Sequence, residues 1–212
     1  MGERLLLDPQ LAPALHAAGV KNVEALLALA GPLEVPSVVT TVDLPVEGTV
    51  GRFHLKRYVY DGWGKAKGLL GRGTLWGTAP EVNEFRVLAK LREQHVPAVR
   101  PVAAAVRTAR GRLVAHALLT EHVPGALDLE RRLKDPSDPL RASRATRRRV
   151  AELIGRCLHR MHSFGLVHRD VYARNLLVRL EEEGPKIWFL DCRRGGPPSW
   201  RSGALPSQAS AR

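Results

Sequence analysis

The sequence predicts an α+β fold in two lobes, a small β-rich lobe followed by a mostly helical one. Strand-like segments and one helix fill the first half of the chain, and a long amphipathic helix with a short hairpin fills the second. The break at Pro124-Gly125 places the boundary between the lobes at His122 to Gly125. With 212 residues, 44% of them hydrophobic, the chain can bury one substantial core or two small lobes that share a cleft.

The β-rich lobe is expected over residues 37–122, after an N-terminal helical extension over residues 1–36. In the extension, apolar residues at helical spacing predict a helix over residues 11–30, which Gly31-Pro32 ends. Alternating or β-branched segments predict strands over residues 37–44, 52–60, 99–107 and 112–120. The first two form an antiparallel hairpin. Residues 61–77 are glycine-rich and basic, which is typical of a loop.

One helix is predicted inside the β-rich lobe, from near Thr78 to about Gln94. Pro80 suits the first helical turn, where its missing N–H group costs nothing. Thr78 can cap this helix, and Glu81 closes a capping box with it.

The helical lobe is expected over residues 123–194. A long helix from about Ser143 to Phe164 carries an apolar stripe, and Gly165 ends it. Two short strands, residues 176–180 and 186–190, flank a polar turn. The remaining residues, 195–212, are rich in Gly, Pro, Ser and Arg and are predicted to be a disordered tail.

The turn after the long helix carries the pattern that indicates chemistry. His168-Arg169-Asp170 is followed by Asn175, five residues after the aspartate, which matches the catalytic loop of kinases. Asp170 would accept a hydrogen bond from the attacking hydroxyl group, and Asn175 would offer an oxygen ligand to Mg²⁺. His168 and Arg169 would brace the loop. A chance match on a polar helix-to-strand turn is the alternative, and the fixed spacing in this context disfavours it.

Two further positions fit the same chemistry. Asp191 ends the apolar strand 186–190, where kinases place an aspartate that binds Mg²⁺. Lys56, on the strand 52–60, can neutralise the α- and β-phosphates of ATP if a glutamate on the following helix holds it. Glu84 is the preferred partner and Glu81 the competitor. The alternatives are an ordinary strand-end aspartate and an exposed strand lysine.

These motifs, taken together, resemble the bacterial lipopolysaccharide kinases, which phosphorylate core sugars such as heptose or Kdo. The resemblance runs from about Val38 to Arg194, and two of its marks are the Lys56 strand and the segment Leu118-Leu119-Thr120-Glu121. It implies a protein-kinase-like fold, ATP and Mg²⁺ as cofactors, and a sugar or glycolipid as acceptor. It also implies that Glu121 to Val123 form the hinge that contacts adenine, mainly through backbone groups.

Three features depart from the family pattern. No glycine-rich loop precedes Lys56, Arg193-Arg194 replace the usual Phe-Gly after the metal aspartate, and only 21 residues follow Asp191. A truncated C-terminal lobe is therefore expected. A weakly active or inactive pseudokinase scaffold and a protein kinase are the alternatives to a sugar kinase.

The charge of the chain bears on partners and location. A formal net charge of +12 favours acidic partners, among which the resemblance selects an anionic membrane surface. No aromatic–basic recognition motif accompanies the charge, so no nucleic acid is expected. No apolar run approaches a membrane span, and Cys157 and Cys192 make no disulfide framework. A cytoplasmic protein is expected, peripheral at the inner membrane if the resemblance holds.

Overall fold

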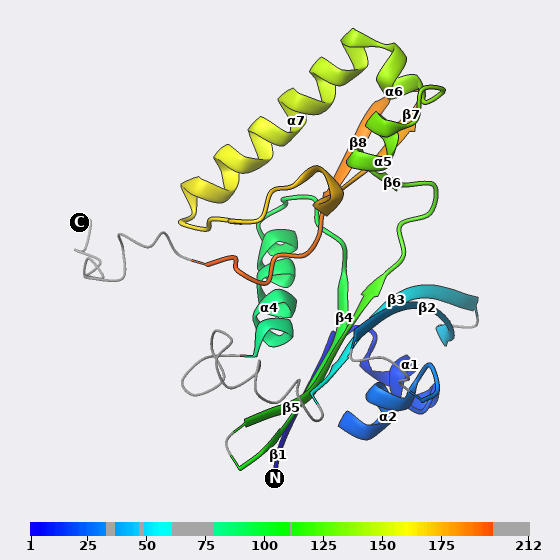
Figure 1. Cartoon of the computed structure of the whole chain (residues 1–212), viewed down its shortest axis with the longest axis vertical. Coiled ribbons are helices and arrows are strands. Elements are labelled where there is room, and N and C mark those ends of the chain that lie inside the picture. Colours follow the sequence, from blue (N-terminus) through cyan, green and yellow to red (C-terminus); the bar gives the residue numbers. More distant parts are fainter. Residues whose placement is uncertain (33–36, 47–48, 61–78, 111, 197–212) are drawn as a thin grey trace, which may run out of the picture.

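The protein folds into two lobes, each built around one antiparallel sheet (Figure 1). A computed structural model describes residues 1–32, 37–46, 49–60, 79–110 and 112–196. The predicted basic loop 61–77, the capping residue Thr78 and all but the first two residues of the tail lie outside these ranges.

The N-terminal lobe is a five-stranded sheet in the order β1-β4-β5-β3-β2. Every neighbouring pair is antiparallel, and hairpins connect β2 to β3 and β4 to β5. The strands are β1 (Gly2–Leu7), β2 (Ser37–Val46), β3 (Thr49–Val59), β4 (Pro101–Ala109) and β5 (Arg112–Glu121). The predicted β2-β3 hairpin and the two predicted strands β4 and β5 are thus present, and β3 lies between β5 and β2.

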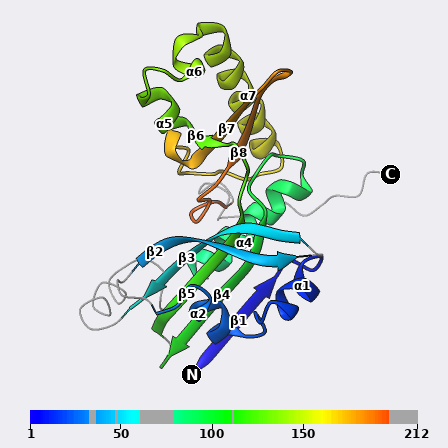
Figure 2. The ribbon, with the colours of Figure 1, turned by 90° about the vertical axis from the view of Figure 1, so that its right-hand side faces the viewer.

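Helices cover both faces of this sheet (Figures 1 and 2). Short helices α1 (Ala12–Ala17) and α2 (Val23–Ala28) pack on one face, where Leu15 and Leu26 join Phe53 and Leu55 of β3 in a buried core. Helix α4 (Pro80–Glu93) lies against β4 and β5 on the other face. Alternate residues of β3 therefore face different helices, and Lys56 faces α4 while its neighbours face α1 and α2.

The N-terminal extension differs from the sequence prediction in two ways. Gly2–Leu7 forms strand β1, paired with β4, instead of leading a helical extension. Its short apolar run carries no decisive period, and only the pairing with the distant β4 makes it a strand. The predicted single helix over residues 11–30 is two helices, because Gly19 adopts φ +89° and breaks the first one.

The C-terminal lobe combines helices with a three-stranded sheet, β6-β7-β8. Its elements are β6 (Leu127–Asp128), α5 (Leu129–Lys134), α6 (Pro139–Ala142), α7 (Arg144–Ser163), a 3-10 turn η1 (Ala173–Asn175), β7 (Leu176–Glu181) and β8 (Gly184–Phe189). The long helix and the β7-β8 hairpin follow the sequence prediction. The short elements β6, α5 and α6 lack enough residues to show a period in the sequence.

Helix α4 ties the two lobes together. Its Val87, Leu88 and Leu91 belong to the same buried cluster as Phe189 of β8 and Met161 of α7. The helix that faces Lys56 is therefore packed on the strand that leads to Asp191. Among the described residues, no helix has the length and apolar character needed to cross a membrane.

Candidate active site

Lys56 and Glu84 meet between β3 and α4. The Lys56 Nζ atom lies 3.6 Å from Glu84 Oε2, and both side chains are largely buried. The inward face of α4 carries Glu84 between Val82 and Val87 in a row of buried residues. The sequence-predicted partner of Lys56 is thus in salt-bridge range.

Asp191 joins this pair from the C-terminal lobe. Its Oδ1 atom lies 2.9 Å from Lys56 Nζ, so Asp191 is closer to the lysine than Glu84 is. Asp191 directly follows the β8 region and has a positive φ of 56°, a conformation that non-glycine residues rarely adopt. The backbone turn directs the carboxylate toward the lysine across the interface of the lobes.

Arg193 is a fourth charged member that the sequence reasoning noted only as a departure from the family pattern. Its Nε atom lies 3.0 Å from Asp191 Oδ1 and 3.5 Å from Glu84 Oε2. Its Nη2 atom donates to the Tyr58 hydroxyl at 2.7 Å, and the guanidinium lies over the Tyr58 ring. Lys56 and Arg193 thus contact the same two carboxylates, those of Glu84 and Asp191. The sequence feature that could have indicated this contact is a basic residue two positions after the predicted metal ligand.

Burial and charge act in opposite directions on the two carboxylates. Burial raises the pKa of Glu84 to about 7, although Lys56 opposes the shift. Burial also raises the pKa of Asp191, but Lys56 and Arg193 outweigh it, so the pKa lies below its ordinary value. Asp191 is therefore held ionised, as a metal ligand requires, while Glu84 titrates near neutral pH.

Glu81 does not have the role that the sequence predicted. The N-cap residue of α4 is Ala79, which makes no side-chain capping bond, and Glu81 is completely buried. Its Oε2 atom lies 2.5 Å from Nδ1 of His116 on β5, and the Tyr60 hydroxyl lies 2.9 Å from the other ring nitrogen. A capping box keeps its glutamate near the solvated helix end, whereas this glutamate points into the sheet. Its contact with His116, which is distant in the sequence, explains why Glu81 turns into the sheet.

The catalytic-loop motif lies between α7 and β7. Asn175 Nδ2 donates to the Asp170 carbonyl oxygen at 2.9 Å, so the two predicted functional residues are linked directly. His168 is buried, and its Nε2 atom lies 3.2 Å from the Leu190 carbonyl oxygen, one residue before Asp191. Burial lowers the pKa of His168, which favours the neutral ring. This histidine joins the predicted catalytic loop to the segment that carries Asp191, the predicted metal ligand.

Two of the four described non-glycine residues with positive φ belong to this site. Arg169 has a φ of 51°, and Asp191 shares this left-handed conformation. Strained non-glycine residues persist where surrounding contacts enforce them, and they cluster at functional sites. The exposed Arg194 completes the loop region, because its Nη1 atom lies 3.1 Å from Asp170 Oδ1. Arg194 was not among the predicted site residues.

The predicted hinge follows β5. Glu121 ends the strand, and its N–H group donates to Arg100 O at 2.9 Å. Val123 accepts from Ala126 N at 3.2 Å, and within the described residues its own N–H group has no partner. A free backbone donor at this position suits the edge of an adenine ring.

The donor set fits Mg²⁺. Asp191 offers carboxylate oxygens, and Asn175 offers its amide oxygen because its Nδ2 atom is engaged by Asp170. Mg²⁺ is commonly held by one or two such hard oxygen ligands together with substrate phosphates. Within the described ranges, no cluster of three or more His, Cys, Asp or Glu side chains offers a metal site made of protein alone.

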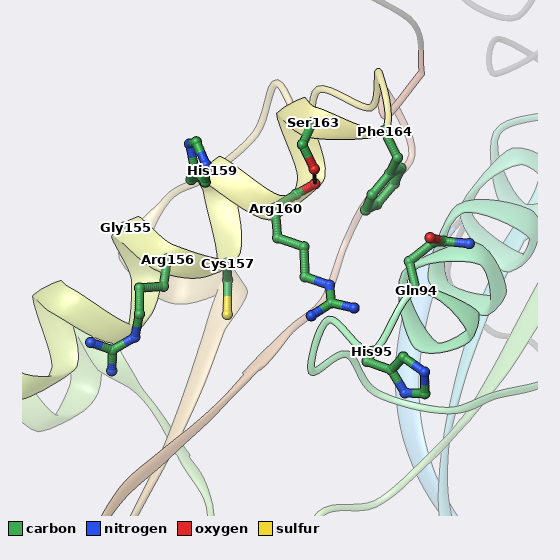
Figure 3. A pocket seen from close by; sticks show the side chains of 9 residues that line it. All are labelled: Gln94, His95, Gly155, Arg156, Cys157, His159, Arg160, Ser163 and Phe164. Carbon is green, nitrogen blue, oxygen red and sulfur yellow. Dashed lines mark hydrogen bonds between the residues drawn. The ribbon is translucent and has the colours of Figure 1, made fainter. Parts of the chain in front are cut away.

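A separate cavity of about 800 Å³ lies between the C-terminal end of α4 and helix α7 (Figure 3). Arg156 and Arg160 of α7 line it together with His95, and Arg160 extends toward the loop at His95. None of the candidate catalytic residues lines this cavity. It is a hollow lined by basic side chains between α4 and α7, distinct from the site at Lys56.

Comparison with known proteins identifies similar chains. The sequence model of the lipopolysaccharide kinase (Kdo/WaaP) family matches residues 56–203. A 3-deoxy-D-manno-octulosonic acid kinase of Haemophilus influenzae (strain PittEE) is 30% identical over 163 residues, which cover 76% of this chain and 64% of that protein. The kinase of the same name from Vibrio cholerae is 30% identical, with coverages of 74% and 58%. The chain thus spans less than two thirds of the length of these relatives.

A solved structure has the same fold. WaaP in complex with acyl carrier protein superposes with a TM-score of 0.57 at 19% sequence identity. The match covers 92% of this chain and 73% of WaaP. The predicted two-lobed, protein-kinase-like fold is therefore confirmed.

Proposed function

This chain belongs to the lipopolysaccharide kinase (Kdo/WaaP) family, and from that premise we propose that it transfers the γ-phosphoryl group of ATP to a sugar hydroxyl. The acceptor is a sugar acid of the 3-deoxy-octulosonic type in lipopolysaccharide core, the substrate class named for its relatives.

One observation carries this proposal: Lys56, Glu84 and Asp191 converge from three elements onto one point. Phosphoryl transfer requires little covalent chemistry from the protein, and catalysis rests on positioning and on neutralising charge. A buried lysine between two carboxylates is the arrangement that anchors the α- and β-phosphates.

Each remaining residue has a part in this scheme. Asp170 accepts the proton of the attacking hydroxyl group, and His168 and Arg169 hold its loop in place. Asn175 and Asp191 would hold Mg²⁺, which supplies neutralisation of the phosphate charge. Glu121 and Val123 contact adenine through the backbone of the hinge.

The protein works at the cytoplasmic face of the inner membrane, where its acceptor is made. Helix α7 supports this location, since it exposes a row of arginines: Arg144, Arg148, Arg149, Arg156 and Arg160. Basic side chains near an anionic lipid surface contribute about 1 kcal/mol each to binding.

The test is ADP release by the purified chain with Mg·ATP, with and without 3-deoxy-octulosonic acid or a lipid that carries it. Acceptor-dependent ADP release and a phosphorylated sugar product are expected. Binding of Mg·ATP with no transfer to any sugar or lipid acceptor would instead show a pseudokinase scaffold.

A further inference from the structure

Arg194 presents an exposed guanidinium beside the proposed base. Its side chain is 58% exposed, whereas that of Asp170 is 14% exposed. Asp170 Oδ1 is its single ion-pair partner among the described residues, at 3.1 Å from Nη1. Most of the five N–H donors of the guanidinium therefore face solvent at the mouth of the site.

The backbone that carries Arg194 is fixed on both sides. Asn83 of α4 donates from Nδ2 to the carbonyl oxygens of Arg193 at 2.7 Å and Gly195 at 3.0 Å. Gly196 exchanges two backbone hydrogen bonds with Val167, just before the catalytic loop. Gly195 lies so close to Val87 that an added Cβ atom would be 2.9 Å from it. The position of Arg194 relative to Asp170 is thus built into the fold.

The side chain of the neighbouring Arg193 is already engaged in contacts with other groups of the site. It is half buried and contacts Asp191, Glu84 and Tyr58 within the site. Arg194 contacts none of these groups. The two arginines therefore divide the region, Arg193 on the phosphate side and Arg194 on the side where an acceptor hydroxyl must approach Asp170.

The resting ion pair has a consequence for the acceptor. While Arg194 donates to Asp170 Oδ1, that oxygen is engaged and accepts a substrate hydroxyl less readily. An anionic group on the acceptor would compete for the guanidinium and free the carboxylate. A carboxylate matches the planar fork of arginine in two parallel hydrogen bonds.

We propose that Arg194 is a specificity-determining residue that binds the carboxylate of the sugar-acid acceptor and so releases Asp170 to receive the hydroxyl group. This inference rests on the function proposed above. It names the contact that lets the site prefer an acidic sugar to a neutral one.

Equilibrium binding tests the contact without requiring turnover. The probes are 3-deoxy-octulosonic acid and its methyl ester, titrated by calorimetry into the full chain with Mg²⁺ and a non-hydrolysable ATP analogue. Wild type should bind the acid about tenfold or more tightly than the ester, as expected for a charge-assisted bidentate contact. Arg194→Ala should bind both probes equally, and Arg194→Lys should retain part of the preference. Arg112→Ala, an exposed arginine of β5, is the matched control and should behave as wild type.

A preference for the acid that survives Arg194→Ala, or the absence of any preference in wild type, overturns the inference. Failure of the proposed function looks different. An Arg194-dependent preference for the acid, without transfer of phosphate to it, would leave the contact standing and remove the kinase activity.

Discussion

At the scale of single residues, the burial of Glu84 determines how the site responds to pH. Its pKa is raised from 4.5 to about 7 in the folded protein. Between these values the folded chain holds a proton that the unfolded chain has lost. Stability must therefore fall as the pH rises through this interval, by on the order of 3 kcal/mol.

Glu84→Gln should remove this dependence, because glutamine mimics the protonated carboxyl group at every pH. Thermal unfolding at pH 5 and at pH 8 measures the effect. Wild type should lose more stability between the two pH values than Glu84→Gln does. The variant should nevertheless turn over more slowly, since Lys56 loses a charged partner.

Glu93→Gln is the control on the same helix, where the side chain is 64% exposed. It should keep the pH profile of wild type. A Glu84→Gln protein whose stability follows pH as wild type does would show that Glu84 ionises normally.

At the scale of elements, Asn83 of α4 holds the segment that follows Asp191. Its two hydrogen bonds to Arg193 and Gly195 fix both arginines relative to the catalytic loop. Asn83→Ala should destabilise the fold by about 1–3 kcal/mol, the range for hydrogen bonds lost from a largely buried site. It should reduce turnover more strongly than it reduces nucleotide affinity, because Lys56 and Glu84 stay in place.

Steady-state kinetics, combined with nucleotide titration, separates these effects. Lys90→Ala, on the exposed side of α4, is the control and should change neither quantity. Equal losses of turnover and nucleotide affinity in Asn83→Ala would mean that α4 itself has shifted.

The elements also show what a single sequence can reveal. Local patterns predicted the β2-β3 hairpin, α4, α7 and the catalytic loop, because their periodicity and spacing lie within short windows. Lys56 and Glu84 could be paired because a central strand and the next helix of this fold face each other. Long-range partners decided the remainder: β4 makes Gly2–Leu7 a strand, and His116 draws Glu81 away from the helix end. No sequence motif predicts the ion pairs that Arg193 and Arg194 form with Asp191 and Asp170.

At the scale of the whole molecule, helix α7 presents several exposed arginines on the C-terminal lobe. The exposed arginines of α7 and the basic cavity at Arg156 and Arg160 lie on the same helix (Figure 3). The β4-β5 hairpin lies at the opposite end of the molecule (Figure 1). This separation allows a charge-matched test of membrane binding.

Co-sedimentation with anionic vesicles should fall steeply with salt, because exposed charges are screened beyond about 8 Å at physiological ionic strength. Reversing Arg148 and Arg149 together to glutamate should weaken binding much more than the same change at Arg110 and Arg112 of the hairpin. Equal binding to neutral and anionic vesicles would rule out an electrostatic contact.

The central claim is that Asp170 acts on the acceptor and Asp191 on the nucleotide, and a paired measurement of nucleotide affinity and turnover tests it most directly. Asp170→Asn keeps the shape of the side chain but removes its charge. It should leave Mg·ATP affinity nearly unchanged and reduce turnover by about 10² to 10⁴, the range for a general base. Asp191→Asn should weaken Mg·ATP binding as well, because a formal charge on the metal is lost. Two variants that both bind and turn over as wild type does would contradict the assignment of this loop.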